Sequence, residues 1–170
     1  MAAVEEALDS YNLKLLYSDI DKIKNKKDKT QLKELFNTLV DYNNYSRIIR
    51  LKKYYNMKNQ TIRSHLLNYG SLTGSRLDKI LRREDPDDIR EALSQTSVGR
   101  KAAVFDKGSE MAVHGRFEKC RHELYFSSNP EIILLAYYII SETELSNVVA
   151  VIEGVRYSMT PENILALLVM

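Results

Sequence analysis

Residues that interrupt helices are scarce in this sequence, which has six glycines and three prolines among 170 residues. Tryptophan is absent, and Cys120 is the only cysteine, so no disulfide can form within the chain. A strong excess of one charge is also lacking, because the net charge is only +2. With 44% hydrophobic and 28% charged residues, this composition predicts a globular, all-α protein of long helices in a reducing compartment.

Long hydrophobic runs are few as well. The apolar segment 132–140 is shorter than the roughly 20 residues that a helix needs to span a bilayer, and Glu142 and Glu144 follow it. The first ten residues, MAAVEEALDS, lack the basic-then-apolar pattern of a secretory signal. We therefore expect a cytoplasmic protein without a membrane span of its own, whose association with a membrane comes through other proteins.

Patterns of catalytic chemistry are missing too. His114, Cys120 and His122 do not have a zinc-site spacing and lack a fourth ligand. Cys120 and His122 are two residues apart, so they do not face each other on a helix. The glycine-containing loop 68–74 lacks the lysine and hydroxyl pair of a phosphate-binding loop, and no pair of carboxylates stands out for acid–base work. The sequence thus predicts no active site, no cofactor and no metal.

Two long helices are expected, each followed by a short one. Asn129 is a good N-cap with Pro130 at the first helical position, and Thr160 with Pro161 repeats this signal. Thr30 is a further candidate N-cap. Apolar residues spaced by three and four predict long helices over 30–56 and 130–155, the second mostly buried, and short helices over 58–67 and 161–169. Short helices are also expected over 75–83 and 86–93, and a weaker helical pattern covers 102–125.

The two long-helix segments share a sequence pattern. An acid precedes an asparagine by three residues in both, as Asp41 and Asn44 and as Glu144 and Asn147. An aliphatic pair, a tyrosine and a methionine follow at matching distances, with one residue more in the first segment. A repeat of this length suggests two copies of a small helical domain rather than a solenoid array. We expect these copies at residues 1–68 and 69–170.

The repeated asparagine indicates a shared local role. A buried asparagine within a long helix is costly unless its amide is paired. Either the amides of Asn44 and Asn147 bond to neighbouring backbone and set the packing register, or they face a groove that receives a partner. The first interpretation is favoured, because polar groups in a core are usually satisfied internally.

Two basic stretches, 24–29 and 47–53, allow a nucleic-acid interpretation. The first is a lysine-rich connection without interleaved aromatic residues, and such runs are more often solvated helix ends. Arg47 and Arg50 lie three residues apart and share a helix face, which suits either a partner-docking stripe or an ordinary wet surface. The small net charge counts against nucleic acid, so a helical nucleic-acid-binding domain is the alternative function.

The repeated segments also carry a family resemblance. The first reads D-x-x-N-x-x-x-I-I-R-x-K-K-x-Y-x-M from Asp41 to Met57, and the second contains P-E-x-x-x-L-A-Y-Y, E-T-E-L-S-N and M-T-P-E-N-I. These motifs resemble the component that is designated C in archaeal and bacterial A/V-type ATPases and d in eukaryotic V-type ATPases. The resemblance runs from about Ala7 to the end. Members of that family are usually about twice as long, with three similar helical domains, so the chain resembles their C-terminal portion.

The resemblance implies a non-catalytic subunit of a rotary ATPase, which links the central stalk to the membrane rotor ring and transmits torque for proton or sodium transport. It implies the stalk subunits and the rotor ring as partners, no nucleic acid, and a cytoplasmic location at the membrane periphery. The residues expected at the partner interface are Asp41, Asn44, Arg47, Arg50, Glu144, Asn147 and Arg156.

Overall fold

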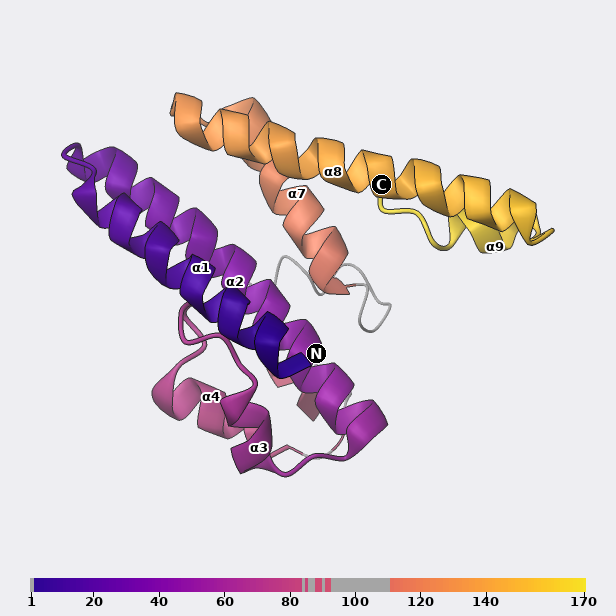
Figure 1. Cartoon of the computed structure of the whole chain (residues 1–170), viewed down its shortest axis with the longest axis horizontal. Coiled ribbons are helices and arrows are strands. Elements are labelled where there is room, and N and C mark those ends of the chain that lie inside the picture. The colour runs from indigo at the N-terminus through magenta and orange to yellow at the C-terminus, as the bar shows by residue number, and fades with distance from the viewer. Residues whose placement is uncertain (1, 84, 86–87, 90, 93–110) are drawn as a thin grey trace. The chain divides into compact units, whose positions relative to one another are not determined.

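The computed structural model describes residues 2–83, 85, 88–89, 91–92 and 111–170. Within these ranges the chain forms helices and no strand, so the predicted all-α fold is confirmed (Figure 1). The helices are α1 (Ala2–Lys22), α2 (Lys26–Tyr55), α3 (Asn59–Ser64), α4 (Gly74–Leu81), α7 (Met111–Phe126), α8 (Pro130–Arg156) and α9 (Pro161–Leu165). The chain divides into two compact units, Met1–Ala112 and Val113–Met170. The expected pair of related domains, with its boundary after residue 68, stays a prediction.

Helices α1 and α2 lie side by side and run antiparallel (Figure 1). Asn25 is the N-cap of α2, because its side-chain oxygen accepts a hydrogen bond of 3.0 Å from the backbone N–H of Lys27. Helix α2 therefore begins four residues before Thr30, whose hydroxyl donates to the carbonyl of Lys26 inside the helix. The prediction of Thr30 as N-cap is wrong, and most of the basic stretch 24–29 is helical rather than a connection.

The second half of α2 carries the core of the first unit. The helix ends at Tyr55, and Asn56 closes it in the left-handed conformation with φ of 44°. The chain then returns over α2 through α3, a loop and α4, which lie together beside its C-terminal half (Figure 1). The buried residues of this cluster are Tyr42, Tyr45, Ile48, Ile49, Ile62, Leu66, Leu72, Leu77, Ile80, Leu81 and Ile89.

The short helices of the first unit differ from their predicted bounds. Helix α3 ends at Ser64 rather than at residue 67, because the chain leaves the helix to reach a contact with α2 described below. Helix α4 overlaps the predicted segment 75–83. Of the helix predicted over 86–93, residues 88–89 and 91–92 are described and are helical. The first part of the segment 102–125 lies outside the described residues.

The second unit contains α7, α8 and α9. Asn129 is the N-cap of α8 as predicted, since its side-chain oxygen accepts from the backbone N–H groups of Glu131 at 3.0 Å and Ile132 at 3.3 Å. Thr160 likewise caps α9, accepting from the N–H of Asn163 at 3.4 Å. These local signals are sufficient to place both helix starts, which agree with the predicted residues 130 and 161.

Helix α9 lies close against α8. It ends at Leu165, four residues before the predicted end. Gly154 of α8 makes the approach possible, because a Cβ at that position would lie 2.6 Å from Cγ1 of Ile164. Gly154 is buried although its neighbours on α8 are exposed.

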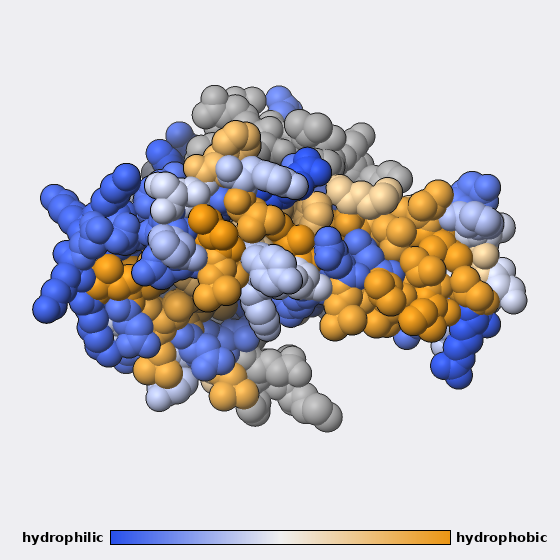
Figure 2. Space-filling model, turned by 90° about the horizontal axis from the view of Figure 1, so that it is seen from above, coloured by the Kyte–Doolittle hydropathy of each residue, from blue (hydrophilic) through white to orange (hydrophobic). Residues whose placement is uncertain are grey.

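The prediction that α8 is mostly buried is wrong. Its buried residues are Ile132, Ala136, Ile139, Ile140, Thr143 and Gly154. Ile133 and Leu135 are half-buried, and the other large apolar side chains of this helix are exposed, including Leu134, Leu145 and Ile152. Figure 2 shows apolar side chains gathered at its right-hand end, where Figure 1 draws the C-terminal half of α8 with α9.

Candidate functional site

A row of polar side chains on α2 holds the chain that follows α3. Asp41, Asn44 and Arg47 are spaced by three residues and therefore neighbour one another on the helix surface. Their partners follow in reverse order along the segment 65–72, so the row and the segment run antiparallel. We call these three side chains the polar row. All three were expected at a partner interface, and the structure places them together.

Asn44 is the centre of the polar row and is almost completely buried. Its side-chain Nδ2 donates to the carbonyl of Leu67 at 3.0 Å, and its Oδ1 accepts from the N–H of the same residue at 2.8 Å. This pair of bonds mimics the pairing between two strands. A buried amide would otherwise cost several kcal/mol, so the two bonds satisfy Asn44 and one peptide group together. The favoured interpretation of this asparagine is thereby confirmed.

Asp41 holds the loop that contains Gly70. Its carboxylate accepts from the N–H of Ser71 at 2.8 Å and of Leu72 at 3.1 Å, and also from the Ser71 hydroxyl. Burial raises the pKa of this carboxyl above 3.8, and the hydrogen bonds from Ser71 and Leu72 oppose that rise only in part. Gly70 has φ of 102°, and a Cβ there would collide with the Asp41 carboxylate.

Two tyrosines connect this loop to α1. The rings of Tyr17 and Tyr69 are stacked with centroids 4.2 Å apart, and the Tyr17 hydroxyl donates to Oδ1 of Asn37 on α2 at 2.6 Å. Burial, followed by the charge of Asp41, raises the pKa of Tyr17 to about 12. The hydroxyl is therefore a hydrogen-bond donor throughout the physiological range. Tyr17 of α1 thus contacts both α2, through its hydroxyl, and the loop, through its ring.

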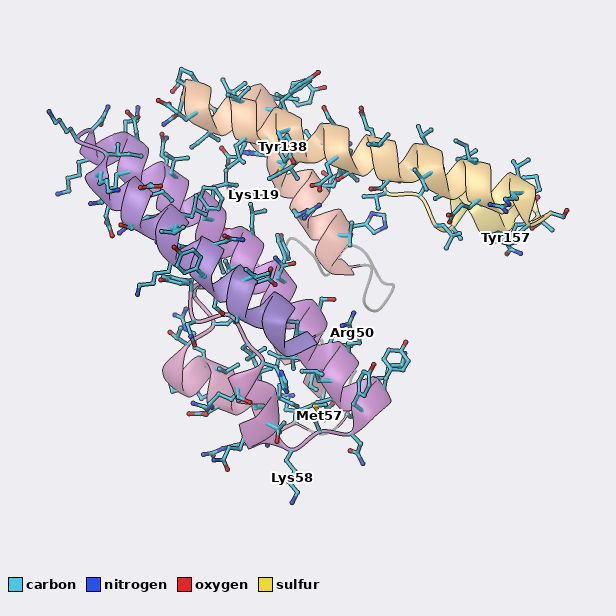
Figure 3. The ribbon with its side chains drawn as sticks, viewed as in Figure 1. Arg50, Met57, Lys58, Lys119, Tyr138 and Tyr157 are labelled. Atoms are coloured by element: carbon cyan, nitrogen blue, oxygen red, sulfur yellow. The ribbon has the colours of Figure 1, made fainter. Side chains whose placement is uncertain are left out.

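Arg47 completes the polar row and reaches α1. Its guanidinium donates to the carbonyl of His65 at 3.0 Å and pairs with the Asp9 carboxylate at 2.8 Å. Arg50, in contrast, is exposed, and Figure 3 shows it on the flank of α2. The two arginines predicted to share a face thus have different surroundings, since contacts to α1 and to the segment after α3 hold Arg47 in place while Arg50 faces outward.

The same amide contact recurs at the end of the second unit. Asn147 Nδ2 donates to the carbonyl of Val169 at 2.8 Å, and Oδ1 accepts from its N–H at 3.0 Å. A left-handed residue directly before a methionine also follows each long helix, Asn56 with φ of 44° and Ser158 with φ of 55°. We call the contacts of Asn44 and Asn147 the two amide clamps. Sequence reasoning identified the asparagines but not their partners.

Glu144 and Arg156, the remaining expected interface residues, lie on the exposed surface of α8. The Arg156 guanidinium lies over the Tyr157 ring at 5.9 Å from its centroid. Figure 3 shows Tyr157 at the far end of α8 and Tyr138 near its beginning. Both glutamate and arginine are therefore accessible to a second molecule.

The basic stretches are engaged within the chain only at Lys29, Arg47 and Lys52, while Lys24, Lys26, Lys27, Arg50 and Lys53 are exposed. Lys29 and Lys33 both pair with Asp21, at 2.9 and 2.7 Å, and these bonds lower the pKa of Asp21 to about 2. Lys52 donates to the carbonyls of Leu81, at 2.6 Å, and Arg83, which satisfies the C-terminal end of α4. Neither stretch presents the uniform basic face that a nucleic-acid backbone requires.

An open hollow of about 420 Å³ lies at the C-terminal end of α2. Lys52, Asn56, Met57, Lys58 and Asn59 line it. Figure 3 shows Lys58 pointing away from the protein, whereas Met57 lies between α2 and α3. The sequence offered no signal for this hollow, because its shape depends on how α3 turns back after Asn56.

Cys120 is fully buried, and burial raises the pKa of its thiol to about 11. A thiol with this pKa carries almost no thiolate at neutral pH, so it is a poor nucleophile. His122, the nearest histidine in the sequence, is turned to its neighbour Phe126, with ring centroids 4.8 Å apart. In the described parts of the chain, no three His, Cys, Asp or Glu residues are grouped as metal ligands.

The fold and these contacts can be compared with known proteins. The chain matches the family described as ATP synthase (C/AC39) subunit over residues 1–167. The chain belongs to this family. The ATP synthase C/AC39 family comprises subunits of the A/V-type ATP synthase, which agrees with the resemblance of the repeated motifs. No curated protein matches the chain. No solved structure matches it either.

Among the described residues of this C/AC39 family member, one helix is long and apolar enough to cross a membrane by length and composition. Helix α8 has 27 residues and a mean hydropathy of 1.3 over its best window, of which 22% is buried. The expectation that its apolar segment is too short rested on residues 132–140 alone, whereas the helix continues to Arg156. A single helix of this kind is weak support for a span, since helices of soluble assemblies meet the same criteria.

Proposed function

We propose that the chain is a non-catalytic coupling subunit of an A/V-type ATPase, which links the central stalk to the membrane rotor ring and transmits torque during proton or sodium transport. The observation that carries this proposal is the family match over residues 1–167. The first unit adds physical support. Torque can pass only through elements that resist bending, and the polar row with the Tyr17 contacts ties α1, α2 and the following loop together.

The proposed docking surface for the stalk includes the exposed side chain of Arg50. Asp41 and Asn44 support this surface indirectly, because their polar atoms hold the segment 65–72 in place. Arg47 has a mixed position, since it is partly exposed and paired with Asp9. We therefore assign direct contact to Arg50 and a positioning role to the polar row.

The experiment is size-exclusion chromatography with light scattering of the chain, alone and mixed with purified central-stalk subunits. We expect a co-eluting complex, and Arg50→Glu should weaken it by about tenfold, equivalent to roughly 1.4 kcal/mol. Arg76→Glu, an equal charge change at an exposed position of α4, is the matched control. No complex with any stalk subunit would contradict the proposed function.

Reversal of both arginines needs separate interpretation. Arg47→Glu removes the contacts to Asp9 and His65, so a weaker complex of the double variant has two explanations. Adding Asp9→Arg restores an ion pair with the glutamate at position 47. If the complex stays weak with this pair restored, the loss comes from the stalk contact and not from the broken contact with α1. Unchanged affinity for the stalk with both charges reversed would remove this face of α2 from the interface.

The proposal includes a peripheral location and no catalytic site, cofactor or membrane span in this chain. The stalk and the rotor ring would hold the chain at the membrane, so removing the ring should release it to the soluble fraction. The nucleic-acid alternative is not favoured, because the family match points to the ATPase, and Lys29, Arg47 and Lys52 of the two basic stretches bind within the chain.

A further inference from the structure

Positive charge is concentrated in one part of the first unit. Residues 42–83, all of which the structure describes, contain ten lysines and arginines and a single acid, although the net charge of the whole chain is only +2. The rest of the chain is therefore net acidic. The ten basic residues are Arg47, Arg50, Lys52, Lys53, Lys58, Arg63, Arg76, Lys79, Arg82 and Arg83, and the acid is Asp78.

The exposed side of α4 carries a dense part of this charge. Arg76 and Lys79 are three residues apart, so they neighbour each other on the helix surface. Arg82 and Arg83 follow directly where the helix ends. All four side chains are exposed, because the apolar residues of α4 occupy its opposite side, within the core of the unit. We call these four residues the α4 basic face.

Two acids lie near the α4 basic face, and their described contacts leave its charge in place. Asp78 belongs to α4 itself, but its carboxylate pairs with Arg63 of α3. Asp88 follows α4, and its backbone carbonyl accepts a hydrogen bond of 3.4 Å from the Arg83 guanidinium. A carbonyl oxygen has no net charge, so neither contact neutralises a charge of this face.

The surroundings of the α4 basic face suit a layer of anionic groups better than a folded protein. Between residues 56 and 83, which are described throughout, no large apolar side chain is exposed. Interfaces between proteins usually bury aromatic or other apolar side chains at their centre. The anionic headgroups of a membrane need no such anchor, because they attract lysine and arginine through charge alone.

We propose that the α4 basic face lies against the anionic lipid headgroups of a membrane surface. This inference rests on the proposed function, in which the chain works beside a membrane. Four charges without an inserted apolar group bind weakly and reversibly, so the rotor ring remains the main attachment and the headgroups add an orienting contact. Arg50 and α4 lie on different sides of α2 (Figures 1 and 3), so this contact leaves the proposed stalk surface free.

The first test is co-sedimentation of the full chain with phosphatidylcholine vesicles that contain or lack phosphatidylserine. We expect binding only to the vesicles with phosphatidylserine. Raising the salt from about 0.1 M to about 1 M should abolish this binding, because the Debye length falls from about 10 Å to about 3 Å. Equal binding to phosphatidylcholine alone, or binding that resists high salt, would overturn the proposal, since an apolar contact would then be responsible.

The second test locates the contact. Arg76→Gln combined with Lys79→Gln should lower the vesicle partition coefficient about 25-fold, since each basic residue near an anionic surface contributes about fivefold. Lys24→Gln combined with Lys27→Gln removes the same charge near the connection between α1 and α2 and should change binding little. All four positions are exposed, so circular dichroism should report equal helicity for both variants. An equal loss of binding in both would overturn the proposal, because net charge alone would then explain it.

The third test separates a membrane surface from nucleic acid. Duplex DNA is offered to the chain in competition with the anionic vesicles, at an equal concentration of negative charge. We expect most of the chain to stay on the vesicles, because lipids diffuse and gather beneath the basic face, whereas the phosphates of a duplex have a fixed spacing. Displacement of most of the chain onto the DNA would overturn the proposal in favour of a nucleic-acid partner.

Stalk binding is an independent measurement on the same variants. Arg50→Glu should weaken the stalk complex and leave vesicle binding nearly intact, whereas Arg76→Gln with Lys79→Gln should do the reverse. Loss of stalk binding with normal vesicle binding would contradict only the proposed function. Absence of vesicle binding beside an intact stalk complex would overturn only the contact between the α4 basic face and lipid headgroups.

Discussion

The side-chain amide of Asn44 and the peptide group of Leu67 bind each other in both directions, with hydrogen bonds of 3.0 and 2.8 Å. The residues are 23 positions apart. Asn147 makes the same contact to Val169 across 22 positions. The amide clamp thus fastens the end of each short helical segment to the long helix before it, and it accounts for an asparagine in the interior of both helices.

Removing the first amide clamp should be more costly than removing the second. Asn44→Ala leaves two buried backbone groups of Leu67 without their partner, and we expect the free energy of unfolding to fall by about 2–4 kcal/mol. Asn147 is partly exposed, so water can replace its bonds, and Asn147→Ala should cost about 1 kcal/mol. Urea unfolding followed by circular dichroism measures both. Asn43→Ala, at the exposed neighbouring position, is the control, and a comparable loss there would contradict the role of the clamp.

Gly70 and Gly74 should respond differently to alanine. Both have positive φ, 102° and 54°, and the left-handed conformation alone costs an alanine roughly 1–2 kcal/mol. At Gly74 nothing lies within 4 Å of an added Cβ, so Gly74→Ala should lose only this amount. Gly70→Ala also drives its Cβ into the Asp41 carboxylate, and we expect a loss of about 3 kcal/mol or more. Thermal unfolding compares the two variants, and equal losses would refute the steric argument.

Gly154→Ala should not give the gain in stability that alanine usually gives in place of a helical glycine. In the interior of an exposed helix, replacing glycine by alanine normally stabilises by about 1 kcal/mol. Here the new Cβ meets Ile164, so α9 must move away from α8. We expect faster amide hydrogen exchange in residues 161–165 and no net gain in stability. Ile164→Ala in the same chain should recover protection of α9, and a stabilised Gly154→Ala with intact protection would contradict the close packing.

Asp41 and Asp21 should contribute to the pH dependence of the free energy of unfolding with opposite signs. The folded pKa of Asp41 is above 3.8, so its protonated form stabilises the fold below pH 3.8 and this contribution is lost as the pH rises through the folded pKa. The pKa of Asp21 is lowered to about 2, so its contribution is present above pH 3.8 and is lost as the pH falls toward 2.

Urea unfolding across this pH range tests the two signs with Asp41→Asn and Asp21→Asn. The stability of wild type relative to Asp41→Asn should decrease as the pH rises, because only the wild type loses the favourable protonated form. Relative to Asp21→Asn, it should decrease as the pH falls. A parallel pH dependence of the two differences would show that burial does not dominate at Asp41.

Local features of this fold were predictable from the sequence, whereas contacts between distant residues were not. Asn129, Thr160 and the prolines after them mark the starts of α8 and α9, because capping depends on residues within one turn. At α2 the prediction of Thr30 as the N-cap was wrong, because Asn25 caps the helix. Lysines follow Asn25 in the sequence, and cations are disfavoured at a helix N-terminus. The ion pairs of Lys29 and Lys33 with Asp21 exist only in the folded chain.

The exposure of α8 could not be predicted for a related reason. An apolar helix face predicts that something covers that face, but the sequence of the helix does not identify the covering element. Tyr42 and Leu145 occupy matching places beside their asparagines, and one is buried while the other is exposed. The partner interface expected at Arg50, Glu144 and Arg156 stays a prediction, because each of these side chains is exposed and each awaits a measurement of binding.

The polar row has a consequence for how this chain tolerates insertions and deletions. One residue inserted between Asp41 and Asn44 would rotate the acid by about 100° relative to the two side chains that follow, and its bonds to Ser71 and Leu72 would be lost. One residue inserted between a long helix and its clamped partner is harmless by comparison, because the two amide clamps already differ by one such residue and both close. Length variation should therefore accumulate in the connections and be excluded from the helix that carries the row.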